Sequence, residues 1–233
     1  MIKNLLRPIR QVFLRGRERF FPQAAKEAAE LAYWRGRFIE ERGELHNDHY
    51  EAIYTSAFGL SHQDYRGKCI LDIGCGPRGS LEWADMVAER VGLDPLVPQY
   101  LNLGAERHKM QYCTAPSHRI PFADGHFDIV TCLNALDHVD DFEGTVAEIK
   151  RVAKLGGLFL LSTEIDHPPT PTEPISLSKE TLQAFQPEFE VLSERLVGSP
   201  EDHNLHGAVI RGAPPYVPAR PGVYVGKMKR QAA

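Results

Sequence analysis

The stretch "CILDIGCGPRGSLEWA", residues 69 to 84, decides the fold class. An apolar run ends there in a loop in which Gly74, Gly76 and Gly79 have GxGxxG spacing. Glycines let the backbone turn tightly and approach a ligand with no Cβ in the way. Between a strand and a helix, this spacing is typical of nucleotide-binding α/β domains. An acid, Asp72, stands in the strand just ahead of the glycines, and it bears on which ligand the loop binds.

The pattern on either side of the loop alternates between strand and helix over residues 68–163. Such alternation predicts an α/β fold, a Rossmann-like doubly wound and mostly parallel sheet with helices on both faces. Ligands of such sheets bind at the carboxyl ends of the strands. We expect strands at 68–73, 91–94, 109–115, 127–134 and 156–163, and helices at 80–90, 96–104 and 141–154.

The flanking segments add three further expectations. N-terminal helices are expected over residues 23–42 and 47–58, where they could form a lid. Four prolines make 165–176 a loop, and a short helix follows at 178–185. Two strands, 189–198 and 203–212, are expected to form a C-terminal antiparallel β-hairpin. The sequence thus divides into 1–60 (basic segment and lid-like helices), 61–212 (ligand-binding domain) and 213–233 (a Pro/Gly-rich tail, extended or partly disordered).

Composition sets broad limits on function. The chain has 233 residues, a formal net charge of −4 and a sequence pI of about 6.2, so no basic field indicates a nucleic-acid partner. Its four cysteines form no CxxC pair and are expected to be buried thiols of a cytoplasmic protein, and no metal site is predicted. No apolar run approaches the roughly 18 residues that span a bilayer.

The first 21 residues, "MIKNLLRPIRQVFLRGRERFF", differ from the rest of the chain. Apolar positions follow helical spacing on one face and six basic residues alternate with them, although Pro8 interrupts a continuous helix. Such a segment either lies on an anionic membrane surface or packs on the domain or on a second subunit of a homo-oligomer. The sequence leaves both alternatives open.

The charges around the loop distinguish its ligands. Asp94 ends the next strand 20 residues after Gly74, where a carboxylate can accept the hydroxyls of a ribose. To this point NAD and S-adenosylmethionine (SAM) fit equally well. Asp72 favours SAM, because a carboxylate repels a pyrophosphate but attracts the ammonium and sulfonium groups of SAM. Asp72 could instead cap a neighbouring loop, Asp94 could cap a helix beginning near Pro95, and Gly79 could serve only close packing.

These motifs resemble the class I SAM-dependent methyltransferases, and closest of all the subgroup acting on small molecules. "LDIGCG" resembles their first motif, with Asp72, Gly74, Cys75 and Gly76, and "GLDP" resembles the second, with Asp94 and Pro95. "IPFADGHFDIV" and "LNALDHVDD…EIKRVAKLGGLFLLS" extend the resemblance over about 67–163. The resemblance implies SAM as the cofactor and methyl transfer as the reaction.

Two departures from the family pattern concern the cofactor site. The acid that commonly contacts the adenine is absent from "TAPSHRIPF", so that contact must come from the backbone around Cys113 to Ser117, which includes Ala115, or from the Ser117 side chain. Leu155 stands where the family usually has proline before two glycines, which keeps the turn. Asn134, at the end of the fourth strand, is either a turn residue or a contact of the methionine end of the cofactor.

The acceptor side is less defined. His138 follows the fourth strand and is a candidate general base, or else a loop histidine bonded to Asp137 or Asp140. The expected acceptor is an O or N atom of a small molecule or a glycan-like compound, held by the N-terminal helices and the proline loop. Weaker base candidates are His126, His167, His203 and His206, and Tyr33, Trp34, His46, His49 and Tyr50 could cover the pocket.

Two other functions compete with methyl transfer. An NAD(P)-binding oxidoreductase has a similar sheet, but Asp72 and the late hairpin weigh against it. A catalytically silent SAM-fold module that binds a partner at a membrane surface is the other alternative.

Overall fold

The computed structural model describes residues 23–200, 204–211 and 214–232. The basic segment over residues 1–21 lies outside them, so membrane contact and self-association through it stay predictions. No helix in the described ranges is both long and apolar enough to cross a membrane.

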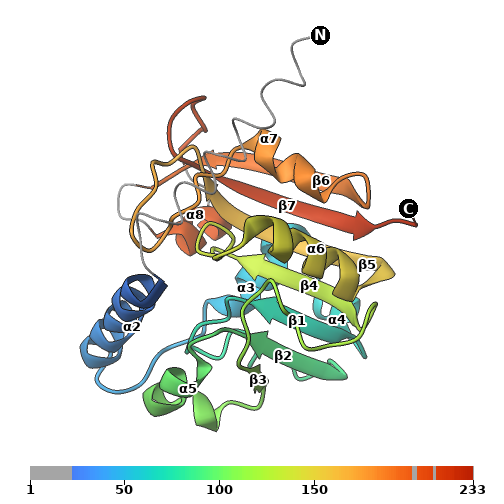
Figure 1. Ribbon diagram of the computed structural model, residues 1–233. Helices are drawn as coiled ribbons and strands as arrows, with labels where there is room; N and C mark the ends of the chain where they lie inside the picture. The colour runs from blue at the N-terminus through green and yellow to red at the C-terminus, as the bar shows by residue number, and fades with distance from the viewer. Residues whose placement is uncertain (1–22, 201–203, 212–213, 233) are drawn as a thin grey trace.

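A seven-stranded sheet forms the centre of the molecule, in the order β3-β2-β1-β4-β5-β7-β6 (Figure 1). The pairs among β1 to β5 are parallel, whereas β7 is antiparallel to both β5 and β6. This arrangement confirms the predicted fold class. The strands are β1 (Cys69–Ile73), β2 (Glu89–Leu93), β3 (Gln111–Cys113), β4 (Phe127–Leu133), β5 (Ala153–Ile165), β6 (Phe189–Gly198) and β7 (Gly222–Arg230).

Helices cover both faces of this sheet (Figure 1). Side chains alternate across a strand, so Leu71 and Ile73 join the core under α6 while Ile70 joins the core under α3 and α4. The α-helices are α2 (Gln23–Glu40), α3 (Tyr50–Tyr54), α4 (His62–Tyr65), α5 (Val97–Tyr100), α6 (Phe142–Val152), α7 (Lys179–Leu182) and α8 (Leu205–Arg211). Short 3-10 helices are η1 (Ser56–Phe58), η2 (Leu101–Leu103), η3 (Ala105–Arg107) and η4 (Gln183–Phe185).

The helix expected over residues 80–90 is absent, and this prediction is wrong. Residues 76–88 form turns, and β2 begins already at Glu89. The guanidinium of Arg90 donates to the carbonyl oxygens of Leu81 and Glu82, at 3.2 and 3.0 Å. The side chain of Glu82 accepts from the backbone of Lys109 at 2.5 Å. Side chains therefore satisfy groups that a helix would have paired internally.

The strand expected over 203–212 is also wrong, because residues 205–211 form α8. Its buried residues Leu205, Ala208 and Val209 have the i, i+3, i+4 spacing of a helix. The partner of β6 lies instead in the tail, where β7 inserts between β5 and β6. The predicted antiparallel pair exists, but a longer connection joins its strands. The domain boundaries at 60 and 212 stay a prediction.

The N-terminal helix α2 confirms the expected helix and lies beside the strand ends near α5 (Figure 1). Leu31, Trp34 and Phe38 pack against a small separate core that contains Leu96 and Tyr100. This contact brings a helix from outside the sheet over the first two strands.

Candidate active site

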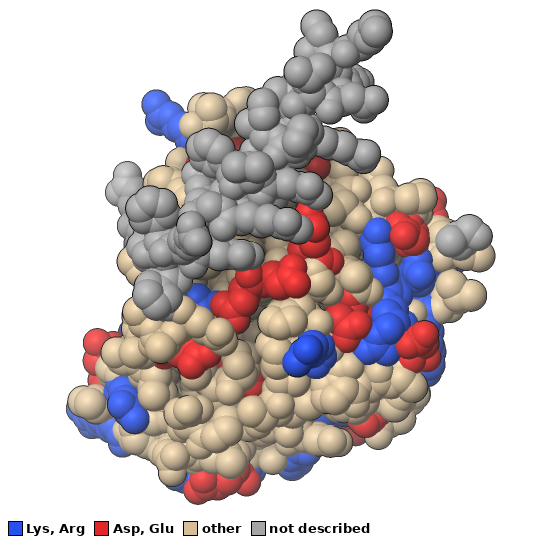
Figure 2. All heavy atoms as spheres, viewed as in Figure 1, with Lys and Arg blue, Asp and Glu red and all other residues tan. Residues whose placement is uncertain are grey.

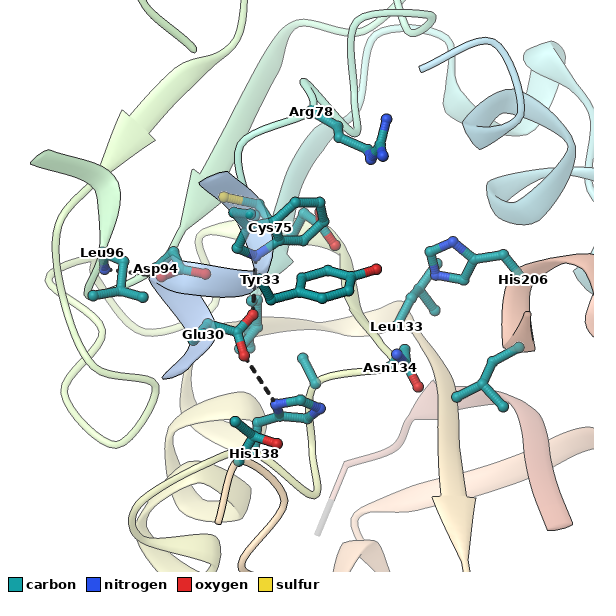
Figure 3. Close-up of a pocket in the computed structure, with 18 of the residues that line it drawn as sticks. Glu30, Tyr33, Cys75, Arg78, Asp94, Leu96, Leu133, Asn134, His138 and His206 are labelled. Atoms are coloured by element: carbon teal, nitrogen blue, oxygen red, sulfur yellow. Dashed lines mark hydrogen bonds and ion pairs between the residues drawn. The ribbon is translucent and has the colours of Figure 1, made fainter. Parts of the chain in front are cut away.

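A cavity of about 1000 Å³ opens at the carboxyl ends of β1, β2 and β4, where ligands of such sheets bind. The space is large, since pockets for single ligands run from about 300 to 1000 Å³. Asp94 and His206 stand at opposite ends of it in Figure 3. Of the cofactor residues predicted from the sequence, the cavity wall contains Asp72, Gly74, Cys75, Gly76, Asp94, Pro95, Ser117 and Asn134, together with the predicted base His138.

Asp72 is 2% exposed and accepts three hydroxyl hydrogen bonds. The Tyr54 hydroxyl donates to Oδ2 at 2.8 Å, Ser80 donates to the same oxygen at 2.5 Å, and Thr131 donates to Oδ1 at 2.6 Å. Thr131 lies directly opposite Asp72 in the register of β1 and β4. Burial raises the pKa of Asp72 to about 6, and the three hydroxyls oppose that rise.

The glycine loop turns back onto the end of β2. The amides of Gly74 and Cys75 both donate to the carbonyl oxygen of Leu93, at 2.8 and 3.4 Å. These amides are therefore not presented to a phosphate, and no helix follows the loop to offer its N-terminus. The structure thus lacks both features by which a dinucleotide-binding turn holds pyrophosphate.

Two of the three glycines are required at the cavity. Gly74 and Gly76 have φ of 71° and 58°, which side-chain-bearing residues rarely adopt. A Cβ at Gly74 would lie 2.3 Å from that of Ala135. At Gly79 the added Cβ would lie 2.8 Å from His108, away from the cavity wall. Gly79, whose φ is also 71°, is not among the lining residues, so its contact with the cofactor stays a prediction.

Asp94 ends β2 and is 8% exposed. Its Oδ1 accepts from the backbone N–H of Leu96 at 2.9 Å. Burial, with the nearby carboxylate of Glu30, outweighs the hydrogen bonds from the backbone of Leu96 and Gly76 and raises the pKa of Asp94 to about 7. Asp94 therefore caps the next turn, as one alternative held, and still lines the cavity.

Of the remaining predicted cofactor contacts, two line the cavity and one does not. Ser117 lines the cavity, and its hydroxyl lies 2.7 Å from that of Thr145. Ala115 is buried but does not line the cavity. Asn134 has φ of 57°, and its backbone N–H donates to Ser162 at 2.6 Å, so it is a turn residue that also faces the cavity.

Helix α2 covers the cofactor end of the cavity. Trp34 Nε1 donates to Glu30 at 2.9 Å, and the Trp34 ring packs edge-on against Tyr100. The guanidinium of Arg78 lies 5.6 Å from the Trp34 ring and donates to Glu41 Oε2 at 2.8 Å. This ion pair connects the end of α2 to the glycine loop. The carboxylate of Glu41 also compensates the positive charge of Arg78.

His138 faces carboxylates. Its Nδ1 lies 3.6 Å from Glu30 and its Nε2 lies 3.9 Å from Glu173 (Figure 3). Burial lowers the pKa of His138, but Glu30, Asp137 and Glu173 outweigh it and raise the pKa to about 9. In this arrangement His138 is an imidazolium at neutral pH. A general base must be unprotonated.

A second group of rings lines the opposite end. His49 stacks on Tyr50 with centroids 4.5 Å apart, and His206 of α8 lies 5.8 Å from His49. Burial, helped by the charges of His49 and Arg78, lowers the pKa of His206 to about 4. His206 is therefore neutral at pH 7. The other weaker candidates lie elsewhere: His126 pairs with Glu89, His167 lies behind the wall, and His203 is outside the described residues.

Several lining residues were not predicted. Tyr54, Glu30 and Glu173 come from segments without a recognisable motif, whereas Arg78 stands inside the glycine loop itself. The lid residues Tyr33, Trp34, His46, His49 and Tyr50 all line the cavity, as expected. The proline loop contributes Thr172 and Glu173.

The charged groups on the cavity wall fit SAM better than they fit a dinucleotide. Carboxylates line the cavity at Asp72 and Asp94, and a Cβ at Gly76 would come within 3.1 Å of Trp34, so the backbone there is closely covered. Acids attract the two cationic groups of SAM, and Asp94 stands where ribose hydroxyls are accepted in related sheets.

Comparison with known proteins agrees with this geometry. Residues 71–161 match the protein family described as "Methyltransferase domain". The chain is 35% identical over 142 residues to the "Uncharacterized methyltransferase YcgJ" of Bacillus subtilis, covering 55% of this chain and 53% of that protein. It is 32% identical over 134 residues to the ubiquinone biosynthesis O-methyltransferase of Methylococcus capsulatus, covering 54% and 56%. The chain thus spans about half the length of these curated relatives.

Among solved structures, the fold is similar to that of the [4+2]-cyclase SpnF, with a TM-score of 0.58 at 19% identity over 79% of this chain and 80% of that one. At this identity the likeness concerns the fold alone. It agrees with the Rossmann-like sheet seen here.

Proposed function

The chain carries a class I SAM-dependent methyltransferase domain, whose cofactor is S-adenosylmethionine, and from this premise we propose that the protein methylates an oxygen or nitrogen atom of a small-molecule or glycan-like acceptor. The observation that carries the proposal is one cavity lined at one end by Asp72 and Asp94 and at the other by the rings of His49, Tyr50 and His206. Its volume of about 1000 Å³ leaves room for a second ligand beside a cofactor.

The residues at the cofactor end have separate tasks. Asp94 accepts the ribose hydroxyls, and Asp72, held by three hydroxyls, attracts the amino-acid end. Ser117 and Asn134 are polar positions on the same wall. When bound, SAM supplies a methyl group on a sulfonium that is already a good leaving group. Positioning of the acceptor then supplies much of the rate.

The charge of the wall bears on the acceptor class. Eight carboxylates line the cavity against Lys26, Arg37 and Arg78, each of which pairs with a carboxylate, and the imidazolium of His138. Acidic side chains also run across the middle of the face shown in Figure 2. Such a wall repels anions and suits hydroxyl-rich or amine acceptors. One of the relatives, the ubiquinone biosynthesis O-methyltransferase, is named for transfer to oxygen.

An oxygen or nitrogen acceptor needs a group that takes its proton. His138 was the candidate from the sequence, but with a pKa of about 9 it accepts a proton only at high pH. His206 lines the same cavity and, with a pKa of about 4, is unprotonated at neutral pH. Of the two, His206 is the one whose imidazole is free to accept a proton at neutral pH, but its low pKa makes it a weaker base than a group whose pKa lies near the working pH.

Transfer of a labelled methyl group tests the proposal directly. The full chain is incubated with SAM carrying an isotopic methyl and a panel of hydroxyl-rich, phenolic and amine acceptors, and the products are resolved by mass. We expect one acceptor class to gain the label and S-adenosylhomocysteine (SAH) to form in equal amount. SAH binding without label in any acceptor would favour the silent module. Binding of NADH in place of SAH would favour the oxidoreductase, which the comparisons do not support. A cyclase on a similar fold shows why turnover must be measured.

A further inference from the structure

Three chemistry-bearing side chains meet where the loop after β4 contacts the proline loop, and a fourth, His167, lies beside one of them. Asp137 and His138 come from the first loop and Glu173 from the second, and one ligand atom of each lies within 4.8 Å of the others. Asp137 is buried with 1% of its side chain exposed, whereas His138 and Glu173 line the cavity. His138 and Glu173 thus stand in the cavity wall, and Asp137 is buried beside them.

The imidazole of His138 is oriented as a ligand would be. Its Nδ1 faces the carboxylate of Glu30 at 3.6 Å, while its buried Nε2 has no hydrogen-bond partner in the described part of the chain. Metal-binding histidines almost always direct one ring nitrogen to a carboxylate or carbonyl and leave the other for the ion. Glu30 supplies that outer contact here.

His167 gives a second and independent indication. Its side chain is only 6% exposed, and its Nδ1 lies 2.9 Å from the carbonyl oxygen of Pro168, which accepts the Nδ1 proton. Nε2 is then the free position of the ring, and it has no hydrogen-bond partner among the described residues. It points at Asp137 Oδ2, 3.5 Å away, which is also buried without a hydrogen-bond partner.

The spacing of these atoms is wide for direct pairing. A charge-assisted N–H···O bond is about 2.7–2.9 Å long, whereas the two histidine–carboxylate distances are 3.5 and 3.9 Å. Four ligands that share an ion through bonds of roughly 2.1 Å stand about 3.4 Å from one another in a tetrahedral site. These two separations lie near that value. His167 is not among the three residues whose ligand atoms all lie within 4.8 Å of one another, so its imidazole must move closer to share the ion.

Among the described residues, the carboxylates Asp137 and Glu173 have only the imidazoles of His167 and His138 as cationic partners. Over the described ranges, no lysine or arginine lies within ion-pair distance of Asp137 or Glu173. Lys26 is nearby, but its ammonium bonds to Asp140 and to the backbone oxygen of His138. A divalent cation would offset the carboxylates and give the unpartnered atoms a common partner.

We propose that His138, His167, Asp137 and Glu173 bind one divalent first-row transition-metal ion, of which Zn²⁺ is the best match. Two imidazoles with two carboxylates suit Zn²⁺ and similar ions, whereas Mg²⁺ and Ca²⁺ prefer sites made of oxygen alone. The sequence predicted no metal site, because the ligands come from two loops and form no spaced motif. A metal-bound His138 cannot act as a base, which agrees with assigning that task to His206.

Titration of the untagged full chain with ZnCl₂ after chelator treatment tests this proposal. We expect one saturable site per chain, and at least tenfold weaker binding in His167→Ala and in the nearly isosteric Glu173→Gln. His62→Ala is the matched control, because His62 also pairs with a carboxylate, Glu51 at 2.8 Å, but on the surface. Zn²⁺ should raise the melting temperature of the original protein and of the control, and not that of the two site variants.

Three results would overturn the proposal: no saturable binding, equal affinity in both site variants, or loss of the site in His62→Ala. Circular dichroism of Glu173→Gln establishes that the variant is folded, so a failure to fold is not mistaken for a lost ligand. An SAH titration on the same stripped protein reports on the proposed function separately, since the metal cluster and the Asp72–Asp94 end use different residues.

Discussion

The indole of Trp34 lies against the backbone of Gly76, so closely that an added Cβ at that glycine would stand 3.1 Å from Trp34 Cζ2. Helix α2 therefore closes the cofactor end of the cavity by contact with the glycine loop. The contact joins a segment near the start of the chain to the motif that defines the domain.

The first prediction concerns this lid. Trp34→Ala should weaken SAH binding about tenfold, roughly 1.4 kcal/mol, because the cofactor end would open to water. Calorimetric titration measures the effect. Ile39→Ala is the control, since Ile39 is on the same helix but 75% exposed. Equal affinity of Trp34→Ala and the original protein would show that α2 does not cover the cofactor.

The second prediction concerns the hydroxyls around Asp72. Tyr54→Phe removes one donor and should lower the free energy of unfolding by about 1–3 kcal/mol and also weaken SAH binding. Tyr65→Phe is a matched control, because it loses a buried hydroxyl that bonds to the backbone oxygen of Tyr54 and not to Asp72. It should lose stability but keep SAH affinity. If both variants bind SAH alike, Asp72 has no role at the cofactor.

The third prediction concerns stability against pH. The pKa of Asp94 is raised to about 7 in the folded chain from an ordinary value of 3.8, so the native state holds a proton that the unfolded state releases. The resulting stabilisation is complete below about pH 4 and is lost as pH rises through 7. Asp72, with a pKa of about 6, acts in the same direction.

In Asp94→Asn, the free energy of unfolding should therefore fall less between pH 5 and pH 8 than it does in the original protein. Urea unfolding of the ligand-free protein at these two pH values measures the difference. The control is Asp85→Asn. Arg90 and Lys109 lower the pKa of the exposed Asp85, which gives the opposite sign and, at the surface, a small effect. An unchanged pH slope in Asp94→Asn would mean that Asp94 is ionised normally.

The fourth prediction separates the two candidate bases. If His206 takes the proton, kcat with both substrates saturating should be flat from pH 6 to 8, and His206→Ala should lose at least a hundredfold in kcat. If His138 takes it, kcat should rise toward pH 9, where that residue loses its proton. If kcat fell a hundredfold in His138→Ala but not in His206→Ala, and if kcat of the original protein rose toward pH 9, the assignment to His206 would be contradicted.

Much of this fold followed from local sequence signals. The buried strands β1, β4 and β5 are short apolar runs, and α6 has the apolar stripe Phe142, Val146, Ile149 and Val152. Both kinds of pattern report burial directly, so they could be predicted. The turn at Gly74 and Gly76 was predictable because its positive φ angles favour glycine, and Asp94 because an acid at the end of the next strand suits a ribose.

The errors arose where tertiary contacts override local preference. Residues 80–88 are helix-compatible, but Arg90 and Glu82 bond to the backbone and β2 begins too early for a helix to fit. Residue spacing in α8 was mistaken for a strand, although Leu205, Ala208 and Val209 are helical in period. The strand β7 was hidden in a tail rich in proline and glycine. The rings at the end of the cavity opposite Asp94 come from the start of α3 and from α8, which share no local signal.

The central claim is that Asp72 and Asp94 hold SAM and not a dinucleotide. Titration of the full chain with SAH and with NADH, in the original protein and in Asp94→Ala, tests it most directly. We predict micromolar SAH binding, no NADH binding, and a loss of more than tenfold, roughly 1.4 kcal/mol or more, in the folded variant. NADH binding, or SAH binding that Asp94→Ala leaves unchanged, would contradict the account.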